Sequence, residues 1–424
     1  MNLLKLLFAA LLICQGCASF GQNKLLQKAN RLYKADQFSE AAKLFEEALK
    51  EKNNLATRTK LAYCYRMNNR LDTAEVLYAQ IVQNDKAKAR TYFYYGETLM
   101  GNGKYDEAKK WFQKYIRLEP EDEKGSMMVE ACERVKLIRP YFPDVRVWEF
   151  PQNSEADDSN PVFFGNSVVF SSDRNPGIKL MKRKSGWTGR DYINLFVSEY
   201  YNDTLFSEPK SFSAKLNQMF KNTGNPAFSK DENTIFFSQN GSEESRKGIF
   251  NMQLYTAKSN GTDKWKSPEK LPFCSTQYNY MHPSISPDGK WLFFVSDKPG
   301  GEGGADIWYS EKTKNGWGKI QNLGKQINTP SHEGFPFFDN QGRLFFCSKG
   351  HAGFGGFDIF VTKRTANDEW EKPVNLGLPI NSSFDDISIF LSKNNRNGAF
   401  TSSRSGGDDD IFLFEILDGK TSMK

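Results

Sequence analysis

Histidine and cysteine are scarce in this 424-residue chain, which holds three histidines and six cysteines. Beyond the first 21 residues there is no C-x-x-C pair, no H-E-x-x-H motif and no Cys/His cluster, so neither a metal nor another cofactor is expected. The remaining cysteines are far apart in the sequence, which favours free, buried thiols over disulfides. They are Cys64, Cys132, Cys274 and Cys347.

Blocks of basic residues are missing as well. The net charge is only +6, and the longest basic run is Lys182-Arg183-Lys184. A nucleic-acid partner is therefore not expected, because it would require a clustered patch facing the phosphates. The chain also lacks the G-x-S-x-G turn of serine hydrolases. Its acidic residues recur at equivalent places instead of forming one asymmetric pair, so we do not expect an enzyme.

No apolar run is long enough to span a bilayer. The run Leu6 to Ile13, which follows Lys5, is typical of the apolar core of a signal peptide. We expect export to the periplasm and cleavage after Ser19-Phe20-Gly21, so that residues 1–21 are removed. The alternative is a lipoprotein signal that ends at residue 16, which would leave Cys17 to carry a lipid anchor.

What the chain does contain is a motif that recurs five times after residue 150. The copies of an Asp/Asn-apolar-aromatic motif are assigned to Asn194-Leu195-Phe196, Asn251-Met252-Gln253, Asp306-Ile307-Trp308, Asp358-Ile359-Phe360 and Asp410-Ile411-Phe412. An apolar run ending in a hydroxyl residue, such as Phe236-Phe237-Ser238, precedes each copy. Short aromatic strands repeated at about 52 residues, with turn residues between them, are typical of β-propeller blades.

The two ends of this array match each other. Pro151 to Asp158, before the first blade, aligns without a gap to Pro379 to Asp386, before the fifth. The segment 145–150 should therefore supply the missing outer strand of the fifth blade and close the ring. We expect a five-bladed propeller over residues 145–418, followed by a tail at 419–424; a sixth, irregular blade stays open as an alternative.

Aromatic residues recur six positions before a second apolar residue in four of the blades. These pairs are Phe206 and Phe212, Trp265 and Leu271, Trp317 and Leu323, and Trp370 and Leu376. Large rings bury most area between neighbouring blades, so the pairs are expected to belong to the core.

Upstream of the propeller the period changes to 33 and 34 residues with helical spacing. Small residues align at Ala29, Ala62 and Gly96, and again at Ala41, Ala74 and Ala108. These are tetratricopeptide positions, where small side chains let two antiparallel helices approach closely. We expect a helical solenoid over residues 22–139 with a capping helix after Pro120, then a linker at 140–144. The fold class is thus α+β multidomain, an all-α solenoid followed by an all-β propeller.

The repeat register predicts which side chains line the concave groove of the solenoid. They are Asn30, Tyr33, Tyr63, Arg66, Phe93 and Glu97. Such a mixture of aromatic and polar groups suits a peptide or a helix of a partner protein.

On the propeller, acidic and amide residues recur just before the inner strand of each blade. The assigned set is Asp158, Asn222, Asn279, Glu333 and Asp386. Their recurrence indicates turn-forming side chains that bond nearby backbone N–H groups. Since they stand on face loops, they are also the candidate contacts for a second partner.

The segment Ser286-Pro-Asp-Gly-Lys-Trp-Leu-Phe-Phe294, followed by Gly304-Ala-Asp-Ile-Trp308, resembles the repeat of TolB-like propellers. The order of signal, tetratricopeptide repeats and propeller resembles the PorE-like proteins, which are periplasmic proteins associated with the outer membrane in type IX secretion. Members of that family usually continue into an OmpA-like peptidoglycan-binding domain, whereas this sequence ends at Lys424. Contact with peptidoglycan is therefore expected only indirectly.

The sequence thus predicts a non-enzymatic scaffold at the periplasmic side of the outer membrane. Envelope proteins would bind the helical groove and the propeller face, and a partner or a Cys17 lipid would hold the protein at the membrane. Two alternatives stay open: a propeller that binds envelope glycans or peptides, and a five-bladed glycosidase. A buried, unequal pair of acids near the propeller axis would favour the glycosidase.

Overall fold

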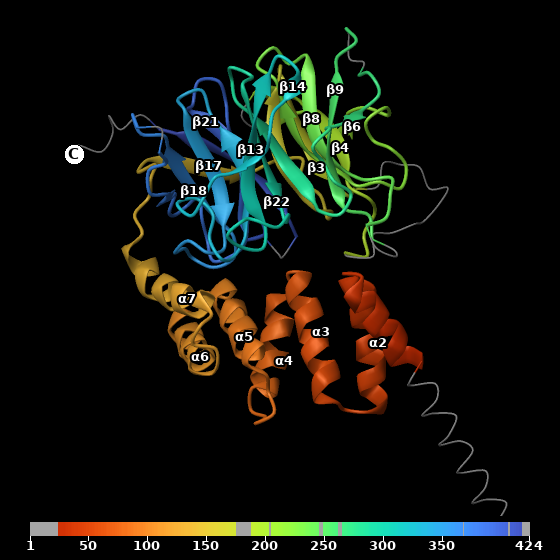
Figure 1. The fold of residues 1–424 in the computed structure, drawn as a ribbon, viewed down its shortest axis with the longest axis vertical. Coiled ribbons are helices and arrows are strands. Elements are labelled where there is room, and N and C mark those ends of the chain that lie inside the picture. Colours follow the sequence, from red (N-terminus) through yellow and green to blue (C-terminus); the bar gives the residue numbers. More distant parts are fainter. Residues whose placement is uncertain are drawn as a thin grey trace, which may run out of the picture. The chain divides into compact units, whose positions relative to one another are not determined.

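A computed structural model describes residues 24–174, 188–202, 205–245, 249–261, 265–367, 369–405 and 408–417. The expected signal peptide, Cys17, the basic run at 182–184 and the C-terminal tail lie outside these ranges. Helices make up the part before residue 138 and strands the part after residue 144 (Figure 1). No helix in the described ranges is both long and apolar enough to cross a membrane.

The helical part follows the predicted repeat. After a helix over residues 24–34 come α2 (Phe38–Glu51), α3 (Leu55–Met67), α4 (Leu71–Ile81), α5 (Ala89–Gly101), α6 (Tyr105–Leu118), α7 (Glu123–Arg134) and the 3-10 turn Val135–Leu137. The small repeat residues Ala41, Ala74 and Ala108 are fully buried. Asn54 and Asp122 cap the N-termini of α3 and α7 by accepting backbone N–H bonds.

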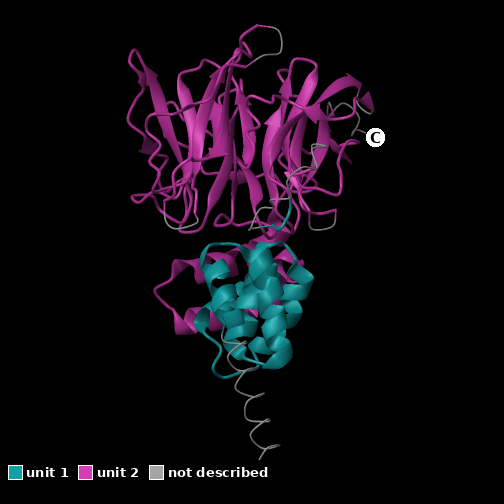
Figure 2. Ribbon diagram, turned by 90° about the vertical axis from the view of Figure 1, so that its right-hand side faces the viewer, with its two compact units in different colours: residues 1–98, 184–190 teal, residues 99–183, 191–424 magenta. Residues whose placement is uncertain are grey.

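The chain separates into two compact units (Figure 2). One comprises residues 1–98 and 184–190, the other residues 99–183 and 191–424, so the division falls within α5 and does not coincide with the expected linker at 140–144. Side-chain burial explains why the linker belongs to the second unit. Phe142 is buried in a propeller core cluster and stacks near Phe414, and the Tyr141 N–H donates to the Leu376 carbonyl.

The propeller is built from five antiparallel sheets. Blade one contains β2 (Asp158–Phe164), β3 (Ser167–Ser172), β4 (Asn194–Asn202), β5 (Leu205–Phe206) and β6 (Lys210–Ser211). Blade two contains β7 (Thr223–Phe228), β8 (Thr234–Asn240), β9 (Met252–Lys258) and β10 (Glu269–Lys270). Blade three contains β11 (Tyr280–Ile285), β12 (Trp291–Ser296), β13 (Asp306–Thr313), β14 (Gly316–Trp317) and β15 (Gln321–Asn322). Blade four contains β16 (Glu333–Phe338), β17 (Arg343–Ser348), β18 (Asp358–Lys363) and β19 (Val374–Asn375).

Blade five closes the ring with a strand from far earlier in the chain. Its strands are β20 (Asp386–Leu391), β21 (Asn397–Ser402) and β22 (Asp410–Ile416), and β1 (Val145–Glu149) pairs antiparallel with β22. Val147 lies opposite Phe414 in this ladder, and the Phe150 N–H donates to the Ile411 carbonyl. The predicted closure is confirmed, and the described strands form five blades without the sixth that the sequence left open.

A phenylalanine at one register position on the second strand is completely buried in every blade. These residues are Phe170, Phe237, Phe294, Phe346 and Phe400. Each stands one or two positions before the hydroxyl residue that ends the apolar run recognised in the sequence. Residues Phe206, Trp265, Leu271 and Leu376 of the aromatic pairs are buried as well. The core is therefore a set of clusters around these rings, with members from neighbouring blades.

The strand register corrects the alignment of the motif copy in blade two. Leu254 occupies in blade two the place of Leu195 in blade one, because Leu254 pairs with Ser238 as Leu195 pairs with Ser171. The motif copy in blade two is therefore Gln253-Leu254-Tyr255, and the assignment to Asn251-Met252-Gln253 was wrong by two residues. The cause is the longer β8–β9 ladder, which extends to a pair between Asn240 and Met252.

Removing the Phe150 ring should test how much the closing segment stabilises the propeller. The ring is 1% exposed and meets Phe170 and Phe206 edge-on, with centroid distances of 5.7 and 4.9 Å. Phe150→Ala should lower the free energy of unfolding by about 3–4 kcal/mol, measured by denaturant titration. Val374→Ala, at a half-exposed position, is the control and should cost less than about 1 kcal/mol. An equal decrease in the free energy of unfolding in both variants would contradict a stabilising role for the closing segment.

Candidate functional site

The predicted groove residues of the first unit lie together in space. The Tyr33 and Tyr63 rings meet edge-on with centroids 5.7 Å apart, and the Arg66 Nη1 donates to Glu97 Oε2 at 2.9 Å. The Arg66 guanidinium also lies over the Tyr63 ring, 5.1 Å from its centroid. Because these four side chains come from three repeats, they form one continuous surface across the helices.

The other two predicted residues contact further side chains of the first unit. Asn30 donates to the Leu26 carbonyl at 2.8 Å and accepts a bond from Lys60, while Phe93 meets the Tyr94 ring at 6.2 Å. The sequence interpretation missed Lys60 and Tyr94. Lys60 stands two residues before the aligned Ala62, and Tyr94 stands two residues before the aligned Gly96. Applying the repeat register to this position as well would have found both residues.

Tyr94 completes a cation–aromatic stack in the groove. The Arg66 guanidinium lies 4.4 Å from the centroid of Tyr94, whose ring is 5.2 Å from that of Tyr63. Burial raises the pKa of the Tyr63 hydroxyl, and burial, followed by repulsion from Lys34 and Lys88, lowers the pKa of Lys60. We define the groove surface as Tyr33, Lys60, Tyr63, Arg66, Tyr94 and Glu97. Amphipathic rings and a fixed guanidinium are the groups most often found at the energetic centre of a protein interface.

The acidic residues on the propeller face are not free to contact a partner. Asp158, Glu333 and Asp386 are at most 1% exposed. Each accepts bonds from the backbone N–H and the hydroxyl of the residue four positions earlier, as Asp386 does from Ser382. The assignment of these three acids to a partner surface was therefore wrong. They hold the turn that leads into each inner strand, which is the role expected from their recurrence.

Asn222 and Asn279 stand one residue earlier in the register than those acids. Their equivalents are Asp157, His332 and Asp385, since β7 and β11 begin at Thr223 and Tyr280. Asn222 Oδ1 accepts the Ile193 N–H at 3.0 Å, and Asn279 Oδ1 accepts the Met252 N–H at 2.9 Å. Each amide thus ties its blade to the third strand of the preceding blade. Both side chains are partly exposed, so their contact with a partner stays a prediction.

A bulge in the inner strand recurs in every blade and faces the propeller axis. At its centre one residue other than glycine adopts a left-handed backbone conformation, with φ between +47° and +55°. These residues are Asn160, Asn225, His282, Phe335 and Ser388, and four of them precede a proline. This conformation turns the backbone N–H towards the preceding blade.

Side chains of the preceding blade accept these N–H groups. Asn160 N donates to Thr401 Oγ1, Asn225 N to Ser171 Oγ and His282 N to Ser238 Oγ, at 2.9–3.0 Å. The acceptors are the residues that follow the buried phenylalanine of the second strand. The hydroxyl ending of the apolar runs therefore serves to join the blades.

Blade three has Val295 in the acceptor position, and a valine cannot accept a hydrogen bond. There the Phe335 N–H donates to His282 Nδ1 at 3.3 Å, and the two rings stack with centroids 3.7 Å apart. Because Nδ1 accepts, the neutral imidazole carries its proton on Nε2. Burial lowers the pKa of His282 to about 3, which keeps the ring neutral at ordinary pH.

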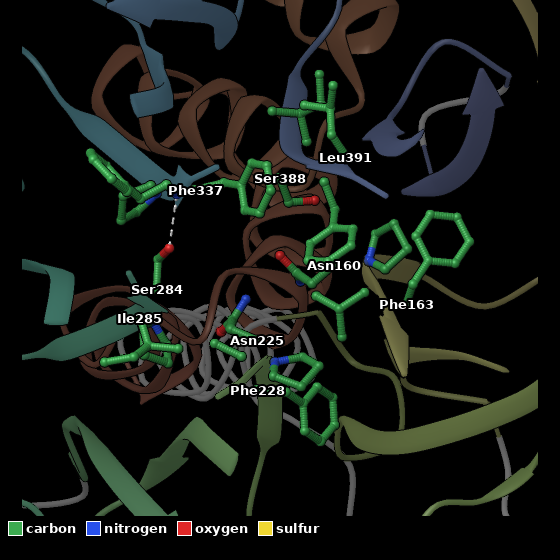
Figure 3. Close-up of a pocket in the computed structure, with 18 of the residues that line it drawn as sticks. Asn160, Phe163, Asn225, Phe228, Ser284, Ile285, Phe337, Ser388 and Leu391 are labelled. Carbon is green, nitrogen blue, oxygen red and sulfur yellow. Dashed lines mark hydrogen bonds between the residues drawn. The ribbon is translucent and has the colours of Figure 1, made fainter. Parts of the chain in front are cut away.

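The bulges line an axial cavity of about 160 Å³. Figure 3 shows the polar groups of Asn160, Asn225 and Ser388 turned towards the centre, with Phe163, Phe228 and Leu391 around them. Further along the inner strands the lining reaches the exposed turns with Lys230, Asn340 and Lys393. The cavity thus has a polar inner end, an apolar middle and an opening at these turns.

The lining of the cavity includes a single carboxylate, Glu232. Its Oε1 lies 3.0 Å from Lys393 Nζ, and its Oε2 accepts the Gly165 N–H at 3.0 Å. Burial raises the pKa of Glu333 and Asp409 to about 8, but neither residue lines this cavity. The described residues include no group of histidines, cysteines and acids suited to a metal, and Cys64, Cys132, Cys274 and Cys347 are free and buried as predicted.

Comparison with known proteins identifies the helical repeats. Two tetratricopeptide repeat models match, one over residues 32–90 and the other over residues 89–122. The chain therefore contains tetratricopeptide repeats followed by a five-bladed β-propeller. A search of curated proteins gave no match.

Solved structures resemble each part at low identity. The type III secretion chaperone SycD of Yersinia enterocolitica, solved with a peptide of the translocator YopD, is 20% identical over 26% of this chain and 91% of that chain, with a TM-score of 0.25. A glycosyl hydrolase from Bacteroides ovatus is 9% identical over 61% of this chain and 84% of that chain, with a TM-score of 0.36. A xylan beta-1,4-xylosidase from Bacillus halodurans C-125 is 12% identical over 62% and 53%, with a TM-score of 0.40. Likeness at this level says nothing about the function of this chain.

The buried imidazole of His282 should make stability depend on pH. The pKa is about 3 in the folded chain and about 6.5 in the unfolded chain, so the unfolded state binds more protons below pH 6.5. The folded state should therefore lose about 2 kcal/mol of stability between pH 6 and pH 4 from this group, as measured by denaturant titration at each pH.

His282→Asn is the matched variant for this measurement. Asparagine already occupies the equivalent positions 160 and 225, tolerates the left-handed conformation, and places an acceptor near the position of Nδ1. The variant should lose less stability than the wild type between pH 6 and pH 4. Parallel curves for the two proteins would contradict the assignment of a neutral, buried His282.

Proposed function

We propose that this protein is a non-enzymatic scaffold whose groove surface binds a segment of a partner protein. Tetratricopeptide repeats with a propeller fit such a scaffold. The observation that supports the groove as the site is the stack of Tyr63, Arg66 and Tyr94, in which both rings are partly exposed and the Arg66 side chain is 16% exposed. Its Glu97 partner fixes the guanidinium, so little side-chain entropy remains to be lost on binding.

The proposed setting is the periplasmic side of the outer membrane, within or near the type IX secretion machinery. The resemblance to PorE-like proteins and the apolar run Leu6 to Ile13 support this setting. Envelope proteins are the proposed partners, and membrane association would come from such a partner or from a lipid on Cys17. Contact with peptidoglycan would be indirect.

We also propose that the protein catalyses no reaction. Glycoside hydrolysis generally uses two carboxylates that flank one bond, whereas the axial cavity offers only Glu232, already paired with Lys393. Glu333, whose pKa is raised by burial, is hydrogen-bonded to Thr329 and Ser348. Asp409 and Asp410 also have raised pKa values, because of burial and neighbouring acids, but neither lines the axial cavity. This distribution of acids supports a binding protein over the glycosidase alternative.

Exchanging the charges of the groove pair tests the proposal. The double variant Arg66→Glu/Glu97→Arg keeps an ion pair and the net charge but removes the cation from the Tyr63 and Tyr94 rings. If the groove binds the partner, crosslinking in intact cells should capture secretion-machine membrane proteins with the wild type and lose them with this variant. The dissociation constant of a recovered partner should rise roughly thirtyfold, which corresponds to about 2 kcal/mol.

A second exchange on the same helical array is the control. Lys43 and Glu40 form an ion pair on α2 that is 63% and 49% exposed, remote in sequence from Arg66 and Glu97. Lys43→Glu/Glu40→Lys should leave capture and affinity unchanged. Capture of the same membrane proteins by both double variants would reject the groove as the binding site.

A further inference from the structure

The inner end of the axial cavity carries hydrogen-bonding groups that the fold does not use. The side-chain amide of Asn225 makes no hydrogen bond with the described residues, although its backbone N–H is bonded to Ser171. His282 Nδ1 is occupied by the Phe335 N–H, which leaves the Nε2–H as a donor among the lining residues. An amide offers both donors and an acceptor, so the cavity can serve groups that do both.

Aromatic rings surround this polar end. Phe163 and Phe390 contact each other with ring centroids 5.7 Å apart, and Phe390 also meets Phe337 at 4.8 Å. Phe228 lies on the neighbouring inner strand and also lines the cavity, while its ring packs against Phe164 with centroids 4.5 Å apart (Figure 3). A ligand with an apolar face and hydroxyl groups at its edge would match both the rings and the amides.

A second hollow continues from the mouth of the axial cavity along the seam of blades one and five. Its volume is about 370 Å³, and it shares Phe163, Glu232, Phe390 and Lys393 with the axial cavity. Trp148 and Tyr200 are also among its lining residues. The two hollows are therefore neighbours, separated by no more than these shared side chains.

The charges around these hollows favour a neutral ligand over a strongly charged one. Glu232 and Lys393 neutralise each other at the boundary, and Asn340 Nδ2 donates to the Lys393 carbonyl at 2.9 Å. Lys230 also lines the cavity, but it stands exposed at the outer opening, away from the polar inner end. Deeper in the axial cavity the lining polar groups are the amides, hydroxyls and neutral imidazole of Asn160, Asn225, Ser284, Ser388 and His282. A buried carboxylate or phosphate would find no fixed cation there to offset its desolvation.

We propose that the propeller binds a neutral oligosaccharide, with one sugar unit in the axial cavity and the following units along the seam beside Trp148. The Asn225 amide and the His282 Nε2–H bond the hydroxyl groups of the first unit, and Phe228, Phe163 and Phe390 pack against its apolar face. This binding is separate from the protein partner of the groove surface and needs no reaction.

The full-length protein should be titrated with neutral oligosaccharides of glucose, xylose and N-acetylglucosamine, using calorimetry and tryptophan fluorescence. At least one of these probes should bind and change the emission of Trp148, a change that Trp148→Phe removes. Asn225→Asp keeps the size of the side chain and tolerates the backbone conformation but loses the amide donor. It should raise the dissociation constant about tenfold, the equivalent of one lost hydrogen bond.

Asn315→Asp, on an exposed turn of blade three, is the matched control and should leave the dissociation constant unchanged. Equal melting temperatures of the variants would show that folding is intact. If Asn225→Asp melts early, Phe390→Leu takes its place, because Phe390 lines both hollows. Failure of every probe to bind at millimolar concentration would overturn the proposal. So would preference for charged oligosaccharides or peptides, or equal affinity in Asn225→Asp and the wild type.

Discussion

The propeller depends on one repeated interaction, the hydrogen bond from the bulged inner strand of each blade to a side chain of the preceding blade. Asn160, Asn225 and His282 supply the backbone donor, and Thr401, Ser171 and Ser238 supply the acceptor. Each bond needs a left-handed residue, which costs of order 1–2 kcal/mol. The same bulge directs side chains towards the axis, so the joint between blades and the lining of the cavity have one origin.

Much of this architecture could be predicted from the sequence, because its signals are periodic. The 34-residue spacing places Ala41, Ala74 and Ala108 at helix contacts, and the match of Pro151 to Asp158 with Pro379 to Asp386 predicts the closing strand. Errors arose where one blade departs from the period. Blade two extends its ladder to Met252, and Asn222 precedes the start of β7 by one residue. Residues of similar type in this blade were therefore aligned to the wrong register position.

The candidate sites differ in how far sequence could predict them. Groove residues such as Tyr63 and Arg66 can be predicted from the repeat register alone. Tyr94, which stacks on Arg66, lies at a repeat position that the prediction did not include. The axial cavity could not be predicted, because bulges in the inner strands decide which side chains face the axis. Val295 nevertheless gave a usable signal in the sequence. It replaces the residue that accepts the hydrogen bond between blades, so another side chain must accept this bond, and His282 does so. Charges seen in sequence, such as Asp386, proved to be buried in turns.

The pairing of β1 with β22 has a consequence for how the chain folds. Arg146 and Glu415 form an ion pair across this ladder although 269 positions separate them in the sequence. Contacts of such separation are costly in chain entropy and form slowly. The first strand of the propeller must therefore wait, unpaired, until the last strand has been synthesised. Until then both edges stay open to proteases and to other chains, so the ring is completed only when β22 has been made.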